Sequence, residues 1–179
     1  MADFNQVLEP GDYQNGTVNA VIDIPMGSTL KIEWDRERAC FVLDRVEPSI
    51  YPKPVNYGFI PQTLDEDGDE LDVLVFCNQP IPTGTWLETK IIGIFNFEDD
   101  GEMDYKIVCV PADDRDTGDS INSLADLGER WQRKIEEHFA HYKDLKKPGT
   151  TKVLGWSDTE AAKQVIKESI DRYEAKRSA

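Results

Sequence analysis

The chain has 179 residues, of which 39% are hydrophobic, so we expect residues 1–179 to form a single domain with its own core. With 35 acidic and 20 basic residues, the formal net charge is −15, which argues against a nucleic-acid partner because binding a phosphate backbone needs a basic surface. No stretch approaches the length of a membrane span, and the first residues lack a basic and apolar leader. We therefore expect a cytoplasmic protein with no membrane partner.

The first two thirds of the chain predict a β-rich region. Several segments alternate apolar and polar residues or carry runs of β-branched residues, and Gly and Pro separate them. The predicted strands are Thr17 to Ile24, Thr29 to Trp34, Cys40 to Leu43, Leu71 to Cys77, Trp86 to Phe97 and Tyr105 to Val110.

The final third changes to a helical period. Apolar residues recur at helical spacing between Glu129 and Leu145, with Gly128 at the start, and a short strand from Thr151 to Trp156 follows. Ser157 stands three residues before Glu160, which is the spacing of a capping box. A second helix should follow. Its predicted inner face is Ala162, Val165, Ile166, Ile170 and Tyr173.

Short strands followed by two helices predict a mainly β protein with flanking helices, in which a small barrel carries both C-terminal helices on its outside. The three cysteines, Cys40, Cys77 and Cys109, are widely spaced in apolar, strand-like sequence. We expect them to be reduced core residues rather than disulfides or zinc ligands.

The most informative segment is acidic. Residues 65–72 read Asp-Glu-Asp-Gly-Asp-Glu-Leu-Asp and run directly into the apolar residues 73–76. Crowded carboxylates beside a buried strand are unfavourable because like charges repel and lose water, unless a cation or a reaction needs them. The segment therefore indicates a metal site. An EF-hand is excluded, because its Gly must stand sixth, whereas here the Gly stands fourth from Asp65.

A second acidic cluster, residues 98–104, lies at a turn between two predicted strands. Taken alone, it is an ordinary hairpin turn, since acids and Gly are common there. If both clusters converged at one end of a barrel, their carboxylates would supply the hard oxygen ligands that Mg²⁺ or Mn²⁺ prefers. The candidate ligands are Asp67, Asp72, Asp99 and Asp104.

Acidic and basic residues also share one face of two predicted strands. Lys31 and Glu33 alternate with apolar residues, and so do Asp104 and Lys106. For one strand, a solvated outer face is the simpler explanation. The repetition favours a charged site.

Residues 67–73, Asp-Gly-Asp-Glu-Leu-Asp-Val, resemble the signature of the soluble family I inorganic pyrophosphatases. Other motifs of that family occur in the same order along most of the chain. They are Ile22-Asp23-Ile24-Pro25, Leu30-Lys31-Ile32-Glu33, Asp44-Arg45, Asn56-Tyr57-Gly58-Phe59, Asp104-Tyr105-Lys106, His141-Tyr142-Lys143-Asp144 and Gly155-Trp156.

The resemblance implies a five-stranded OB-like closed barrel that hydrolyses pyrophosphate to two orthophosphates. It implies Mg²⁺ as the cofactor, with Mn²⁺ or Zn²⁺ as substitutes and Ca²⁺ as an inhibitor. It also implies a homo-oligomer, with a hexamer favoured.

Residue roles follow from the resemblance position by position. Asp67, Asp72 and Asp104 match ligands of the metals that hold the attacking water, Asp99 matches a ligand of a substrate-borne metal, and Asp69 matches the general base. The residues that match the groups holding the phosphates are Lys31, Arg45, Tyr57, Lys106, Tyr142 and Lys143. Glu33 is counted with them as a substrate-binding residue. The remaining acids of the first cluster, Asp65, Glu66 and Glu70, are interpreted as solvated turn residues.

The sequence departs from the family pattern at three positions. Asp23 and Asp100 stand where Glu is usual, and the shorter Asp23 should lose or reroute the contact of the longer side chain. Lys53 stands four residues before Tyr57, where Tyr is common, and receives no role.

Some residues have simpler explanations. By periodicity alone, Tyr142 is a core residue of its helix. His138 and His141 lack a third soft ligand nearby in sequence, so we expect surface or interface packing.

Two other functions compete with pyrophosphate hydrolysis. An OB-type module for single-stranded nucleic acid fits the barrel but not the charge. A passive divalent-metal binder would leave Lys31, Arg45, Lys106 and Lys143 without a purpose.

Overall fold

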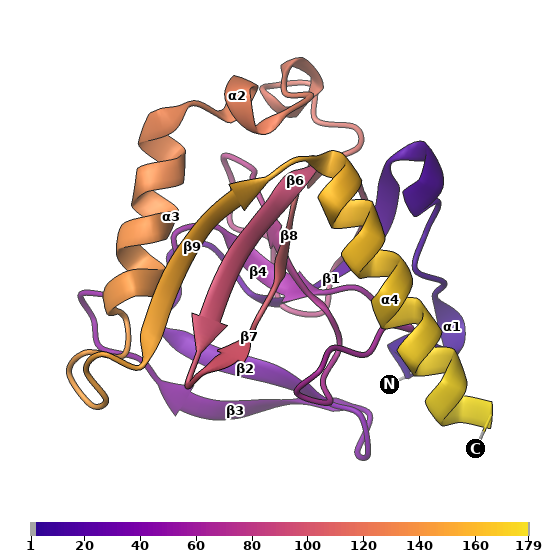
Figure 1. The fold of residues 1–179 in the computed structure, drawn as a ribbon, viewed down its shortest axis with the longest axis horizontal. Coiled ribbons are helices and arrows are strands. Elements are labelled where there is room, and N and C mark those ends of the chain that lie inside the picture. The colour runs from indigo at the N-terminus through magenta and orange to yellow at the C-terminus, as the bar shows by residue number, and fades with distance from the viewer. Residues whose placement is uncertain (1–2, 179) are drawn as a thin grey trace.

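A closed ring of five strands forms the centre of the computed structural model, which describes residues 3–178 (Figure 1). Its order is β1 (Thr17–Ile24), β4 (Asn56–Phe59), β5 (Asp72–Val75), β8 (Lys106–Pro111) and β6 (Trp86–Asp99). The ring closes because β1 pairs with both β4 and β6. The β5–β8 pair is parallel, and the other pairs are antiparallel. This confirms the predicted barrel.

Four further strands extend or flank the ring. β2 (Leu30–Asp35) and β3 (Cys40–Val46) form a separate hairpin, which lies below the ring in Figure 1. β7 (Glu102–Met103) turns back on the end of β6, and β9 (Thr151–Ser157) pairs antiparallel with β6.

Both long helices pack outside the ring, as predicted. α3 (Glu129–His141) lies against β9, and α4 (Thr159–Ser178) lies against β6, on opposite sides of the view in Figure 1. Ala162 and Ile166 of α4 are fully buried. Four shorter helical segments were not predicted from the sequence. They are α1 (Phe4–Val7), η1 (Tyr13–Asn15), η2 (Gly118–Ser120) and α2 (Leu124–Leu127).

The strands that carry the site are buried on both faces. Val73 and Val75 of β5 join the core cluster that includes α4, whereas Leu74 joins the cluster under α3. A strand covered on both faces reads as a continuous apolar run, which explains residues 73–76. Gly58 in β4 permits the close approach of β1, since a Cβ there would lie 1.9 Å from the Val21 carbonyl oxygen.

Several predicted boundaries differ from the structure. β4 was not predicted as a strand. β3 extends to Val46 rather than Leu43. α3 ends at His141 rather than Leu145, because the chain enters tight turns in which Asp144 N–H donates to the His141 carbonyl oxygen. Leu145 is consequently exposed.

The residue that caps the N-terminus of α4 lies one position later than the capping box predicts. Asp158, rather than Ser157, caps the helix and accepts a 3.0 Å hydrogen bond from Ala161 N–H. Ser157 belongs to β9 and accepts a hydrogen bond from Asn96 instead.

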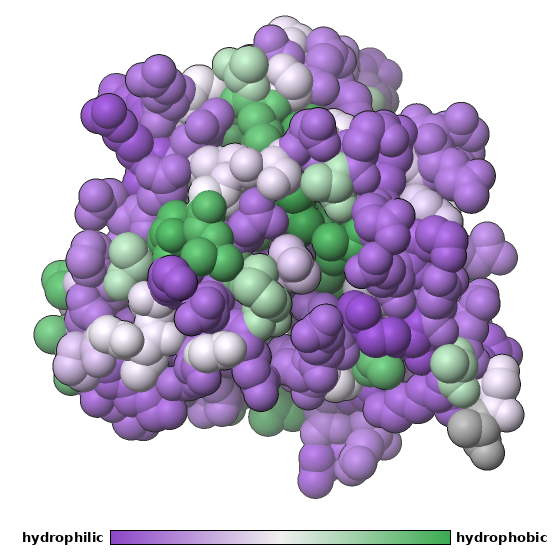
Figure 2. Space-filling model, in the orientation of Figure 1, coloured by the Kyte–Doolittle hydropathy of each residue, from purple (hydrophilic) through white to green (hydrophobic). Residues whose placement is uncertain are grey.

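None of the three cysteines forms a disulfide, but only Cys109 is fully buried, so the core prediction is wrong for Cys40 and Cys77. Within residues 3–178, no helix is both long enough and apolar enough to cross a membrane. Figure 2 shows a mainly hydrophilic face, with hydrophobic residues gathered near its middle over β9 and β6.

Candidate active site

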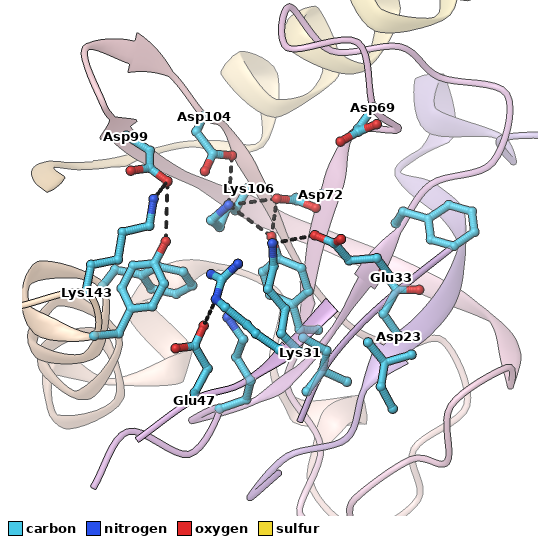
Figure 3. Close-up of a pocket in the computed structure, with 18 of the residues that line it drawn as sticks. Asp23, Lys31, Glu33, Glu47, Asp69, Asp72, Asp99, Asp104, Lys106 and Lys143 are labelled. Carbon is cyan, nitrogen blue, oxygen red and sulfur yellow. Dashed lines mark hydrogen bonds and ion pairs between the residues drawn. The ribbon is translucent and has the colours of Figure 1, made fainter. Parts of the chain in front are cut away.

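A pocket of about 740 Å³ opens between the β2–β3 hairpin and one end of the barrel. Every site residue predicted from the sequence lines it, which brings together segments from β2 to the end of α3 (Figure 3). These residues are Lys31, Glu33, Arg45, Tyr57, Asp67, Asp69, Asp72, Asp99, Asp104, Lys106, Tyr142 and Lys143.

Lys106 lies at the centre of the polar cluster (Figure 3). Its Nζ is 2.7 Å from Asp72 Oδ2, 2.8 Å from Asp104 Oδ1 and 3.2 Å from the Tyr57 hydroxyl. Lys106 and Asp72 are register partners at the starts of the parallel strands β8 and β5, so the barrel itself sets their spacing. Burial alone would lower the pKa of Lys106, but Asp104 and Asp72 outweigh it and hold that pKa well above its usual value.

Asp99 organises a second cluster at the end of β6. Its carboxylate pairs with Lys143 and accepts a 3.4 Å hydrogen bond from the Tyr142 hydroxyl. The early end of α3 makes this contact possible, because Lys143 follows the helix and turns back toward β6. Burial raises the pKa of Tyr142, so its hydroxyl stays protonated. Residues 98–104 form the β6–β7 hairpin, and the turn still places both Asp99 and Asp104 in the pocket.

The β2–β3 hairpin supplies the cations on the opposite wall. Lys31 pairs with Glu33 and lies 3.6 Å from Asp44. Arg45 Nε is 2.8 Å from Glu47 Oε1, and its Nη1 is 2.6 Å from Asp44. The acids hold both cations at the pocket, where an incoming anion could exchange with them.

Asp69 stands on the acidic turn, between the barrel and the hairpin. Its main-chain N–H donates to Asp67 Oδ1 at 3.0 Å, and its carbonyl oxygen accepts from Asp65 N–H at 2.7 Å. Gly68, with φ +96°, gives the turn its left-handed residue. Desolvation, Asp67 and Glu70 raise the pKa of Asp69, which makes its carboxylate a stronger base.

The expectation that Asp65 and Glu70 are solvated is wrong. Asp65 is 6% exposed and pairs with Arg172 of α4 at 3.1 Å, and Glu70 is 8% exposed. Glu70 Oε1 accepts hydrogen bonds from Arg36 at 2.8 Å and Asn5 at 2.6 Å. Only Glu66 of the three is exposed. The two buried acids therefore anchor the turn that carries Asp69.

The predicted metal ligands share the pocket without forming a compact carboxylate group. Within residues 3–178, no three His, Cys, Asp or Glu side chains lie together as a group that could hold a metal. The Lys106 ammonium lies between Asp72 and Asp104 instead. Asp99 Oδ1 is nevertheless buried without a hydrogen-bond partner. A buried carboxylate oxygen without a partner can serve as a ligand of a hard divalent cation.

Asp23 and Lys53, which have no role in the prediction from sequence, also line the pocket. Asp23 is buried, its Oδ1 lacks a hydrogen-bond partner, and burial with nearby Asp72 and Glu70 raises its pKa well above the usual value. Among the described residues, Asp23 Oδ1 therefore makes no hydrogen bond that would replace the contact of the longer Glu side chain. Lys53 also lines the pocket. Its departure from the family pattern was the only signal in the sequence.

The expectation of surface or interface packing is wrong for His138, although His141 is exposed. His138 is 8% exposed and stacks on Tyr142, with ring centroids 5.5 Å apart. Burial, with Lys53 and Lys134, lowers the pKa of His138 to about 3. It is therefore a neutral packing residue at physiological pH.

Comparison with known proteins assigns the chain to a family. A family model described as inorganic pyrophosphatase matches residues 20–174. The chain belongs to the inorganic pyrophosphatase family. The inorganic pyrophosphatase of Haemophilus influenzae is 64% identical over 173 residues, which cover 97% of this chain and 98% of the relative. Members of the family are hydrolases acting on pyrophosphate, and the resemblance found in the sequence is confirmed.

Solved structures of inorganic pyrophosphatases share the fold. The crystal structure from Neisseria gonorrhoeae has a TM-score of 0.94 and 60% identity, covering 96% of this chain and 99% of its own. The structure from Thermus thermophilus has a TM-score of 0.86 and 38% identity, covering 93% and 97%. The barrel and its outer helices are therefore the pyrophosphatase architecture.

Proposed function

We propose that the protein is a magnesium-dependent inorganic pyrophosphatase, in which Asp69 activates water while a cationic wall holds the substrate. The observation that carries the proposal is the pocket itself, where carboxylates and cations from distant segments face one another. Pyrophosphate is a dense polyanion, so its hydrolysis needs positive charge on the phosphates and negative groups to hold metal ions.

Asp67, Asp72 and Asp104 would hold metal ions near the attacking water, and Asp99 would hold one carried with the substrate. When bound, divalent cations lower the pKa of the water and neutralise phosphate charge. The buried, unpaired Asp99 Oδ1 supports this assignment. Mg²⁺ is the cation expected first, with Mn²⁺ or Zn²⁺ as substitutes and Ca²⁺ as an inhibitor.

Asp69 would accept a proton from the attacking water at its carboxylate. Its exposed side chain can reach a water in the pocket, whereas Asp65 and Glu70 on the same turn are buried in ion pairs. The raised pKa of Asp69 supports this role, because proton transfer improves as the pKa of a general base approaches the working pH.

The phosphate groups would be held by Lys31, Arg45, Lys106 and Lys143. Each already forms an ion pair with a carboxylate in the pocket, so phosphate oxygens can replace or share an existing partner rather than meet a bare buried charge. Arg45 offers a planar fork, and each Lys offers a compact charge. The Tyr57 and Tyr142 hydroxyls can donate to phosphate oxygens, and Glu33 keeps Lys31 in place.

The proposal is tested by a phosphate-release assay with pyrophosphate across Mg²⁺, Mn²⁺, Zn²⁺ and Ca²⁺. We expect orthophosphate release with Mg²⁺ and none after chelation, with recovery when Mg²⁺ is restored. Folded protein that releases no orthophosphate with any of these cations would overturn the proposal. Equal orthophosphate release with and without chelator would show that hydrolysis does not depend on a metal ion.

We further propose that residues 1–179 act as one domain and that subunits assemble into a homohexamer in the cytoplasm. Three cysteines without disulfides support a reducing compartment. Sedimentation of the purified protein measures the assembly, and a monomer at micromolar concentration would contradict it.

A further inference from the structure

Lys53 is a buried cation that lines the active-site pocket just before β4. Its side chain is 7% exposed, and its Nζ lies 4.5 Å from the ring centroid of Tyr57, 5.3 Å from that of Tyr142 and 5.4 Å from that of Phe139. Aromatic faces attract an ammonium group, particularly when water is excluded. Lys53 Nζ therefore lies among three aromatic rings, which offset part of the cost of burying its charge.

The pairing of Lys53 differs from that of the other pocket cations named above. Each of those has a carboxylate partner. Among residues 3–178, Lys53 Nζ has no ion-pair or hydrogen-bond partner, whereas an ammonium group carries three donors. Lys53 is only 7% exposed, so water has little room to take the place of a partner. The three donors of the Lys53 ammonium are therefore available to an anion in the pocket that this residue lines.

The main chain holds Lys53 in this position. Its N–H donates to the Ser28 carbonyl oxygen at 2.8 Å, and its own carbonyl oxygen accepts from Gly27 N–H at 2.9 Å. Pro52 and Pro54 flank it and restrict the backbone further. The main chain of Lys53 is therefore fixed, and the rings of Tyr57, Tyr142 and Phe139 surround its ammonium group.

The electrostatic surroundings of Lys53 also favour the binding of an anion. Burial and the neighbouring Lys106 charge lower the pKa of Lys53 to about 7. An anion bound between the two lysines would relieve their repulsion and supply the missing hydrogen-bond acceptor. Lys106 already forms ion pairs with Asp72 and Asp104, whereas no carboxylate pairs with Lys53 among the described residues.

We propose that Lys53 is a further substrate-binding residue, whose ammonium donates a hydrogen bond to a phosphate oxygen of pyrophosphate beside Lys106. This inference rests on the proposed function, because it names one more contact to the same substrate. It assigns to this chain a cationic contact at a position where the family commonly has Tyr.

The test compares K53M with K134M. Methionine supplies an unbranched apolar side chain of similar length and removes the ammonium group with its charge and its three donors. Lys134 is a matched control, because it is an exposed lysine on α3 whose Nζ lies 4.6 Å from the Trp131 ring centroid, and it does not line the pocket. Titration calorimetry measures binding of imidodiphosphate, a slowly hydrolysed analogue, at fixed Mg²⁺, and steady-state phosphate release gives KM and kcat.

We expect K53M to bind imidodiphosphate roughly 10- to 100-fold more weakly, as for the loss of one charge-assisted hydrogen bond, and to show a raised KM. K134M should match the wild type. Circular dichroism checks that K53M is folded, and K53Q provides a second neutral variant.

Unchanged imidodiphosphate affinity in folded K53M and K53Q would overturn the proposal and would leave the proposed function intact. Equal weakening in K53M and K134M would also overturn it, because the effect would then be one of general charge. If the wild type released no phosphate, the proposed function would fail, while the binding comparison would still decide the role of Lys53.

Discussion

Among the acids of the first turn, Asp69 combines an exposed carboxylate with a raised pKa. Replacing it by Asn keeps the shape but removes the proton acceptor. We expect D69N to slow phosphate release by roughly 10²- to 10⁴-fold, the usual contribution of a general base. This loss corresponds to about 3–5 kcal/mol of activation free energy.

Glu66 is the matched control for Asp69, because it is an exposed acid on the same turn. E66Q removes the same charge and should leave turnover within about twofold, since an exposed charge contributes little. Both variants should keep the wild-type circular dichroism spectrum. Wild-type turnover in D69N would refute the assignment, and equal losses in both variants would point to net charge instead.

The buried ammonium of Lys53 should also make stability depend on pH. Its folded pKa of about 7 lies below the ordinary value of 10.5, so between these values the unfolded chain binds the proton and the folded protein does not. Stability therefore rises with pH in this window, by up to about 1.4 kcal/mol per pH unit. The charged groups that influence the pKa of Lys53 are Lys106, Asp72, Lys31 and Glu47.

Urea unfolding of wild type and K53M at pH 6 to 9.5 measures this effect. The stability advantage of K53M should be constant below about pH 7 and should shrink as the pH rises above it. His138, with its pKa of about 3, stays neutral throughout. A difference between the two proteins that does not change with pH would show that the pKa of Lys53 is not lowered.

At the level of elements, α4 holds the acidic turn in place. Arg172 donates to the Leu64 carbonyl oxygen at 2.8 Å, to Ser169 Oγ at 2.9 Å and to Asp65 Oδ1 at 3.1 Å. R172A leaves the buried Asp65 carboxylate unpaired, which should cost about 1.5–3 kcal/mol of unfolding free energy. It should also lower kcat by roughly tenfold, because a loosened turn misplaces Asp69.

Lys167 provides the control on the same helix. It forms an exposed pair with Asp171, with side chains 53% and 57% exposed, and such pairs contribute about 0–1 kcal/mol. Urea unfolding and phosphate release of R172A and K167A measure both effects. If the two variants proved equally stable and active, α4 would have no part in holding the turn.

The long elements could be predicted from the sequence because their patterns are local. Alternation in β1 and helical spacing in α3 depend on neighbouring residues. β4 escaped prediction because Asn-Tyr-Gly-Phe has no clear alternation, and its pairing with β1 and β5 defines it as a strand. The burial of Asp65 and Glu70 was equally hidden, since their partners Arg172 and Arg36 stand 107 and 34 positions away.

At the scale of the whole molecule, the net charge is −15, and acidic residues also outnumber basic residues in the lining of the active-site pocket. Motif resemblance was enough to choose twelve of the residues that line this pocket, because a shared fold brings the same positions together. It was not enough to predict Lys106 between Asp72 and Asp104 or the isolation of Lys53. These arrangements depend on the register of β5 with β8 and on the rings of Tyr57, Phe139 and Tyr142 around Lys53, which are properties of the assembled fold.

Divalent cations should consequently stabilise the entire molecule. A cation that binds the folded pocket but not the unfolded chain raises the unfolding free energy, by about 2.7 kcal/mol at 100 times its Kd. Mg²⁺ should therefore raise the unfolding temperature, whereas NaCl of equal ionic strength should have a smaller effect because it only screens charge. D67N should reduce the Mg²⁺ shift. D113N should retain it, since Asp113 is exposed and pairs with Arg115 away from the pocket. Calorimetric scans of the three proteins in both salts measure this, and equal shifts with Mg²⁺ and NaCl would contradict a specific cation site.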